Sequence, residues 1–111
     1  MIRRIAIYSR KSRFTGKGDS VENQVQICRD YISANLTEEG VENIIDVYED
    51  EGYSGKSPNR PKFKEMMTKE QETPYHYIVA YKLDRISRNI GNFYKLLETL
   101  TEKKTKLEFA K

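Results

Sequence analysis

Cysteine and histidine are nearly absent from this 111-residue chain, which contains one of each, Cys28 and His76. A single cysteine rules out an internal disulfide, and one cysteine with one histidine cannot form a multi-residue zinc site. We therefore expect Cys28 to lie in the core. His76 stands at the start of a predicted strand, so we expect it to have a structural role.

Long apolar runs are also missing. None approaches the roughly 20 apolar residues that span a bilayer, and the amino end lacks the apolar region of a signal peptide. These absences predict a cytoplasmic protein with no membrane partner. Glycine and proline are few, and 33% charged with 37% hydrophobic residues is the balance of an ordinary globular chain. The length predicts one domain.

Positive charge is concentrated at the amino end, although the net charge is only +3. The cations that precede the first acid, Asp19, are Arg3, Arg4, Arg10, Lys11, Arg13 and Lys17. A basic segment of this kind suits a phosphate-bearing partner. A solvated basic face gives the same pattern, so charge alone leaves both readings open.

The apolar pattern predicts strands that alternate with helices. Strands are predicted at 2–8, 41–48 and 77–81, and a fourth in 105–111. Helices are predicted from an Asp19 cap to about Leu36, from Pro61 to before Thr73, and from Ile86 to Leu100. Alternation of this kind predicts an α/β fold with three layers, in which helices flank a mainly parallel central sheet.

Polar loops are predicted between these elements, at 9–18 and at 50–61. The second loop is long and rich in turn-forming residues, as functional loops often are. Met66 and Met67, in the helix that follows it, are predicted to fill the core.

Candidate functional residues follow three of the predicted strands. They are Arg10 and Ser12 after the first strand, Arg60 after the second, and Asp84, Arg85 and Arg88 after the third. The carboxyl ends of parallel strands form the usual ligand site of open α/β sheets, so these residues are expected to converge. Arg85 and Arg88 share one face in the first turns of a predicted helix, where the helix dipole disfavours cations. An anion is expected to offset that cost.

Phosphate is the anion that this set suits best. Guanidinium groups bind phosphate oxygens in pairs, and several arginines together stabilise charge that develops on a phosphoryl group. The same field favours the alkoxide of Ser12, which makes it a candidate nucleophile for a phosphoseryl intermediate, with no metal required. Asp84 is a candidate to position an arginine or to relay a proton.

Each candidate also has a structural alternative. Ser12 can cap a turn, Arg60 can be a surface cation beside a proline, and Asp84 can cap the last helix. Arg85 and Arg88 can pair with solvent or with glutamates. The pattern of residues alone does not decide between these alternatives and the functional roles.

Taken together, the motifs resemble a known family. They are Tyr8-Ser9-Arg10-Lys11-Ser12, then Gln24, then the segment 53–61 (YSGKSPNRP), then Leu83-Asp84-Arg85-Ile86-Ser87-Arg88. In this order they resemble the catalytic domain of the serine recombinases, the resolvase and invertase family. The Gly-Tyr-Ser-Gly loop is similar to that of the large, transposon- or phage-borne branch. Spacing alone leaves open whether Gln24 faces the loop or solvent.

The resemblance implies site-specific recombination of double-stranded DNA. Ser12 would attack a phosphodiester, form a 5′-phosphoserine link and release a 3′-hydroxyl, with no metal or nucleotide cofactor. The positions that match the family's phosphate-binding arginines are Arg10, Arg60, Arg85 and Arg88, and those that match supporting positions are Gln24 and Asp84. The resemblance also implies self-association, because four subunits of such enzymes cut two duplexes, rotate and rejoin them.

The family pattern continues beyond the motifs present in this chain. We therefore expect residues 1–111 to be an amino-terminal catalytic domain, truncated before the assembly helix and the DNA-recognition domains, that folds but does not recombine DNA alone. The alternative is a non-catalytic α/β module that binds nucleic acid or a phosphorylated partner through the arginines. A nucleotide-binding domain is less favoured, because no Gly-x-Gly-x-x-Gly or Walker-type loop follows the first strand.

Overall fold

The central feature of the computed structural model is a four-stranded parallel sheet. Residues 1–11, 20–51, 60–86 and 90–111 are described, apart from the side chains of Asp84 and Ile90. The strands in spatial order are β2 (Glu42–Glu51), β1 (Ile2–Lys11), β3 (Tyr77–Ala80) and β4 (Lys106–Phe109). Every neighbouring pair is parallel, which confirms the predicted sheet.

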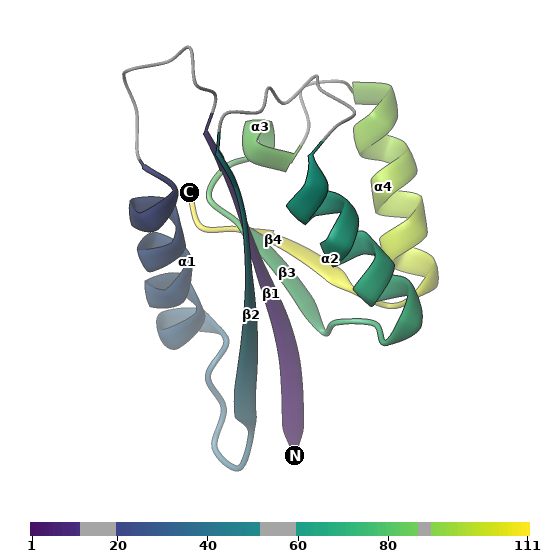
Figure 1. The fold of residues 1–111 in the computed structure, drawn as a ribbon. Coiled ribbons are helices and arrows are strands. Elements are labelled where there is room, and N and C mark those ends of the chain that lie inside the picture. Colours follow the sequence, from purple (N-terminus) through teal and green to yellow (C-terminus); the bar gives the residue numbers. More distant parts are fainter. Residues whose placement is uncertain (12–19, 52–59, 87–89) are drawn as a thin grey trace.

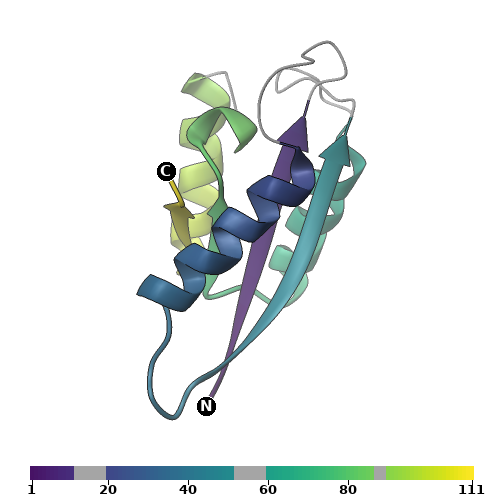
Figure 2. The same cartoon turned by 90° about the vertical axis from the view of Figure 1, so that its left-hand side faces the viewer.

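Helices cover both faces of this sheet. One face carries α1 (Val21–Asn35), and the other carries α2 (Pro61–Glu72) and α4 (Ile90–Glu102), as Figures 1 and 2 show. The short α3 (Leu83–Ile86) lies near the carboxyl ends of the strands (Figure 1). The predicted three-layer α/β architecture is therefore confirmed. Within the described segments, no helix combines the length and the apolar character that crossing a membrane requires.

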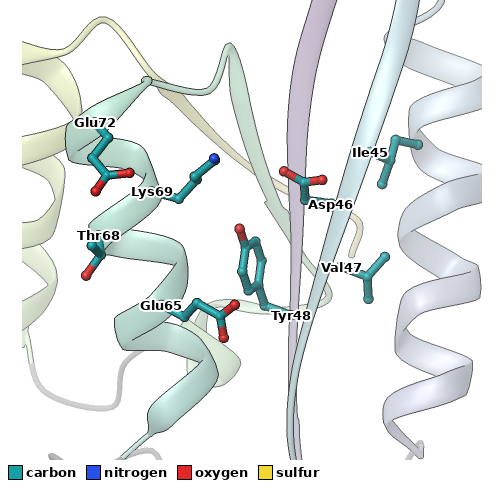
Figure 3. A pocket seen from close by; sticks show the side chains of 8 residues that line it. All are labelled: Ile45, Asp46, Val47, Tyr48, Glu65, Thr68, Lys69 and Glu72. Carbon is teal, nitrogen blue, oxygen red and sulfur yellow. The ribbon is translucent and has the colours of Figure 1, made fainter.

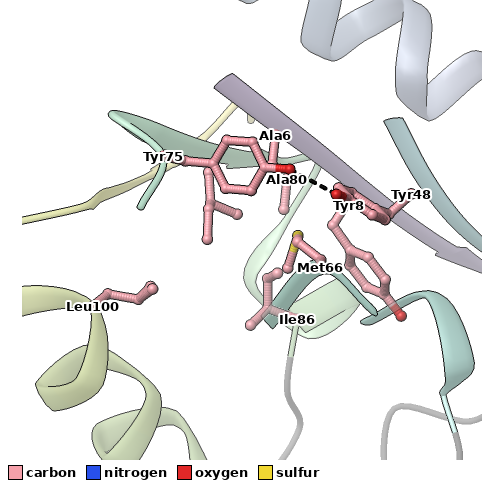
Figure 4. Close-up of a cluster of buried hydrophobic side chains, with 9 residues drawn as sticks. Ala6, Tyr8, Tyr48, Met66, Tyr75, Ala80, Ile86 and Leu100 are labelled. Atoms are coloured by element: carbon pink, nitrogen blue, oxygen red, sulfur yellow. Dashed lines mark hydrogen bonds between the residues drawn. The ribbon is translucent and has the colours of Figure 1, made fainter. Parts of the chain in front are cut away.

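The central strand β1 divides the core into two clusters, because successive side chains of a strand point to opposite faces. Ile5 and Ile7 pack with Cys28 of α1 on one face. Ala6 and Tyr8 belong to the cluster on the other face, with the members labelled in Figure 4. Cys28 is fully buried, as predicted, and burial raises the pKa of its thiol to about 12.

The methionine prediction concerns the second of these clusters. Met66 of α2 is buried in it, and Met67 packs against it from a partly buried position. The prediction that both fill the core is confirmed.

Two strands are longer than the sequence pattern predicts. β1 runs on through Lys11 and β2 through Glu51, so the predicted loops at 9–18 and 50–61 both begin too early. In the added segment Arg10 pairs with Asp50 along the parallel ladder. Each strand end is stabilised by the other through backbone hydrogen bonds, which a local polar pattern does not reveal.

Two helix boundaries also differ from the prediction. The cap of α1 is Ser20 rather than Asp19, since the Ser20 hydroxyl accepts a hydrogen bond from the Asn23 amide at 3.1 Å. The helix predicted to begin at Ile86 also differs, because Leu83–Ile86 already form α3; residues 87–89, between α3 and α4, lie outside the described part of the structure. The carbonyl of Ile86, in α3, accepts a side-chain hydrogen bond from Arg60 at 2.8 Å.

Structural polar contacts gather at the amino ends of the strands. His76 lies there, as predicted, and its Nδ1 accepts a hydrogen bond from the Arg4 amide at 3.2 Å. The buried Thr105 hydroxyl lies 2.7 Å from a Glu70 carboxylate oxygen, and the other oxygen of Glu70 accepts from the Tyr75 amide. This network ties the end of α2 to the starts of β3 and β4.

Candidate functional site

The carboxyl end of β1 is held by a buried glutamine. Gln24, on the first turn of α1, donates from Nε2 to the Arg10 carbonyl at 3.1 Å, and its Oε1 accepts from the Arg10 amide at 3.3 Å. The side chains of Gln24 and Arg10 are both buried. Gln24 therefore faces Arg10, a residue of the segment 9–18 that the sequence analysis assigned to the first loop, and the alternative that it faces solvent is wrong. Its amide continues the hydrogen bonding of the sheet and joins α1 to the strand end.

Arg60 links the start of α2 to the end of α3. Its Nη1 donates to the Ile86 carbonyl at 2.8 Å and lies 3.4 Å from that of Arg85. Its guanidinium carbon stands 4.2 Å from the centre of the Phe63 ring and 5.7 Å from that of Tyr8. Only 8% of the residue is exposed, so the alternative that Arg60 is a surface cation is wrong.

The third strand leads directly into α3, which contains Asp84 and Arg85. The Arg85 guanidinium carbon lies 5.9 Å from the centre of the Tyr81 ring. Asp84 is the second residue of α3, and residues 87–89, which lead into α4, lie outside the described part of the structure, so the alternative that it caps the last helix stays a prediction. Its side chain lies outside the described part of the structure, as do Ser12 and Arg88.

A buried carboxylate at the end of β2 was missed by sequence reasoning, which placed Asp50 in a loop. Asp50 is 1% exposed and accepts hydrogen bonds from the Tyr8 hydroxyl at 2.8 Å and from the amides of Lys62 and Phe63, each at 3.0 Å. Two features of the sequence could have indicated this role. Asp50 is an acid near the end of a predicted strand, and the predicted helix that follows begins with proline and has no capping residue of its own.

The phenol of Tyr8 is held in its protonated form. Burial raises its pKa well above the ordinary value. The Arg60 guanidinium lowers it, and the hydrogen bond to Asp50 raises it further. Tyr8 therefore remains a hydrogen-bond donor to Asp50 throughout the neutral pH range.

The described candidates thus lie at one end of the sheet. Arg10 is the penultimate residue of β1, Arg85 lies in α3 after β3, and Arg60 directly precedes α2 and contacts the backbone of α3. A family model described as Resolvase, N terminal domain, matches residues 5–111. This chain belongs to the resolvase family.

Solved structures agree with this assignment of the resolvase domain. The N-terminal catalytic domain of TP901-1 integrase is 26% identical, with a TM-score of 0.78 over 97% of this chain and 77% of that one. A resolvase family site-specific recombinase from Streptococcus pneumoniae is 26% identical, with a TM-score of 0.74 over 97% and 72%. The predicted resemblance to serine recombinase catalytic domains is confirmed. No curated protein sequence matches the chain.

A lower-identity structure shares the fold of the resolvase domain. The C-terminal catalytic domain of ISC1926 TnpA, an IS607-like serine recombinase, is 23% identical, with a TM-score of 0.77 over 97% of this chain and 70% of that one. At this identity the likeness concerns the fold alone.

A hollow of the resolvase domain has none of the candidate arginines among its described lining residues. It has a volume of about 700 Å³ and opens between β2 and α2 (Figure 3), where it is lined by Ile45, Asp46, Val47, Tyr48, Glu65, Thr68, Lys69 and Glu72. Three carboxylates and one cation make it unsuited to phosphate. Among the described residues, no group of three or more histidine, cysteine or acidic side chains is arranged to hold a metal ion.

Replacing Gln24 with alanine should destabilise the resolvase domain. The change removes both bonds to the Arg10 backbone, so we expect the free energy of unfolding to fall by about 2 kcal/mol. Gln26→Ala is the matched control, because Gln26 is exposed and its side chain donates to the exposed Asp30 of the same helix. Urea unfolding measures both variants, and equal losses would show that Gln24 has no special role.

Proposed function

We propose that this resolvase domain cleaves and rejoins double-stranded DNA in site-specific recombination, with Ser12 as the nucleophile. The Ser12 oxygen attacks phosphorus, the bond from phosphorus to the 3′-oxygen breaks, and that oxygen leaves as a 3′-hydroxyl after taking a proton. The product is a 5′-phosphoserine ester. Family membership supports the proposal, and the observation that carries it is the placement of Arg10, Arg60 and Arg85 at the sheet end from which the chain continues to Ser12.

The burial of the arginines supports this chemistry. Arg10 is 1% and Arg60 8% exposed, so their positive charges act in a medium less polarisable than water. Arginine stays protonated at any working pH, and its charge favours the phosphorane-like transition state over the phosphodiester. Arg88 and Asp84 are proposed to complete the set, with Arg88 on the phosphate and Asp84 in support. Gln24 supports Arg10 by fixing its backbone.

Rejoining needs no external energy source under this proposal. The phosphoserine ester retains the energy of the broken phosphodiester, so a 3′-hydroxyl can attack it and release Ser12. The partners proposed are duplex DNA and further copies of the protein, assembled as a dimer or tetramer. No metal or nucleotide cofactor takes part in the proposed steps.

Mapping the covalent DNA adduct tests the proposal. The full-length protein is incubated with a labelled duplex that carries the junction sequence of its own element, and the reaction is stopped with denaturant. Protease digestion and mass spectrometry then locate the attached nucleotide. We expect one modified peptide with the 5′-phosphate on Ser12. Attachment at another residue, or no adduct on a duplex that the protein binds, would contradict the proposal.

A further inference from the structure

β2 forms one edge of the sheet of the resolvase domain. It pairs with β1 along its whole length of ten residues, and no described strand lies on its other side. An edge strand presents a row of backbone amides and carbonyls to which another strand can pair. β4, at the opposite edge, has only four residues, so β2 offers the longer row.

The two faces of the β2 edge differ in chemistry. Ile45 and Val47 are half-buried and pack against the apolar cluster under α1. Asp46 and Tyr48 point to the α2 side and line the hollow between β2 and α2 (Figure 3). A strand added to this edge would lie about 4.8 Å from β2, with its side chains alternating between the same two faces. Every second side chain would therefore enter the hollow, and the others would cover Ile45 and Val47.

The charge of β2 determines which strand suits this edge. β2 contains five acidic residues and no basic residue. Three of the acids, Glu42, Glu49 and Glu51, are exposed, and Asp46 is half-buried. Like charges on neighbouring strands are destabilising, so the β2 edges of two copies would repel one another. The edge therefore favours a basic segment over a second copy of itself.

The hollow adds negative charge on the α2 side, because its lining has three carboxylates and one ammonium group. Asp46 lies 3.7 Å from the guanidinium of Arg4, and Glu65 lies 3.3 Å from the ammonium of Lys62. Both carboxylates are partly exposed, and pairs of this kind contribute only about 0–1 kcal/mol. A carboxylate also accepts several hydrogen bonds at once, so both can bind a further cation.

We propose that the β2 edge is a docking surface for another protein, which adds an extended segment of alternating basic and apolar residues to the sheet. Backbone hydrogen bonds to β2 hold the segment, as in other complexes formed by strand addition. Its basic side chains enter the hollow beside Asp46, and its apolar side chains cover Ile45 and Val47. This docking is independent of the DNA chemistry proposed above.

A short synthetic peptide that alternates lysine and valine is the probe. Fluorescence anisotropy of the labelled peptide with the full-length protein should show saturable binding, with a Kd on the order of 10–100 μM. A peptide of the same composition, with its lysines in one block and its valines in another, should bind at least about 10-fold more weakly, because it cannot match both faces. No saturable binding of the alternating peptide, or equal binding of both peptides, overturns the proposal.

Glu72→Lys tests whether the basic side chains enter the hollow. Glu72 is the exposed last residue of α2, where a cation suits the helix dipole, so the fold should be unaffected. Affinity for the alternating peptide should fall about 3- to 10-fold. Glu98→Lys is the matched control, because Glu98 is an exposed acid of α4 outside the described lining of the hollow. Equal losses in both variants would show general charge attraction and contradict the proposal.

Hydrogen exchange with mass spectrometry locates the bound peptide on the full-length protein. The amides of β2 should exchange more slowly when the alternating peptide is bound, and those of β4 should be unchanged. Slower exchange in β4 and not in β2 would refute docking at this edge. Protection of β2 that grows with protein concentration in the absence of peptide would assign the edge to a second copy and refute the proposed partner.

Discussion

Ser12→Ala should abolish the covalent protein–DNA adduct and leave DNA affinity within about twofold of the wild-type value. Alanine has no oxygen to attack phosphorus, so the ester cannot form at any DNA concentration. The arginines proposed to attract the DNA backbone are unchanged, and backbone contacts supply most of the affinity of DNA-binding proteins. Denaturing gels of the full-length protein with labelled junction duplex measure the adduct, and a gel shift on the same samples measures binding.

The same variant separates catalysis from simple binding. A non-catalytic module that holds nucleic acid or a phosphorylated partner through its arginines would form no adduct even as wild type. Ser33→Ala is the control, since Ser33 is an exposed serine of α1 and should leave adduct formation unchanged. An adduct that survives Ser12→Ala would assign the nucleophile to another residue.

Arg60→Ala should reduce both stability and cleavage. The change removes the hydrogen bond to the Ile86 carbonyl and the stack on Phe63, so we expect the free energy of unfolding to fall by about 1–3 kcal/mol. If Arg60 also stabilises charge on the phosphate, the adduct rate should fall by roughly 100- to 1,000-fold. Urea unfolding and adduct kinetics on the folded fraction measure the two effects.

Arg60→Lys separates the effect of the positive charge of Arg60 from the effect of its planar guanidinium. Lysine keeps the positive charge, but it has neither the planar fork that reaches the α3 carbonyls nor the flat face that stacks on Phe63. We expect it to recover little of the lost rate. Arg29→Ala, at an exposed arginine of α1, should change neither quantity. Near-wild-type cleavage by Arg60→Ala would remove Arg60 from the proposed site.

The apolar pattern was sufficient to predict the fold. The centre of β1, Ile5–Tyr8, and the whole of β3 are continuous apolar runs because both faces of a parallel sheet are covered by helices. The spacing of Cys28 and Ile32 placed α1 on that sheet, and Pro61 marked the first turn of α2. These signals depend on neighbouring residues in the chain, which is why they can be read without coordinates.

Features that depend on contacts between distant segments were not predicted. The strand ends were assigned to loops because their residues are polar, but pairing of β1 with β2 keeps Arg10 and Asp50 in the sheet and buried. The spacing of Gln24 left open whether it faces the loop or solvent, and only the fold shows that it binds the Arg10 backbone. A local pattern records polarity, whereas burial of a polar group depends on a partner supplied by another element.

By itself, the sequence determined the alternation of strands and helices, the family resemblance and the identity of the candidate residues. Tertiary structure decided which contacts hold the described candidate residues in place. Asp50 binds both β1 and the first turn of α2, Arg60 binds the Ile86 carbonyl of α3, and Gln24 binds the backbone at the end of β1. The physical reason is that backbone groups at strand and helix ends need hydrogen-bond partners, and only the packed fold determines which side chain reaches each one.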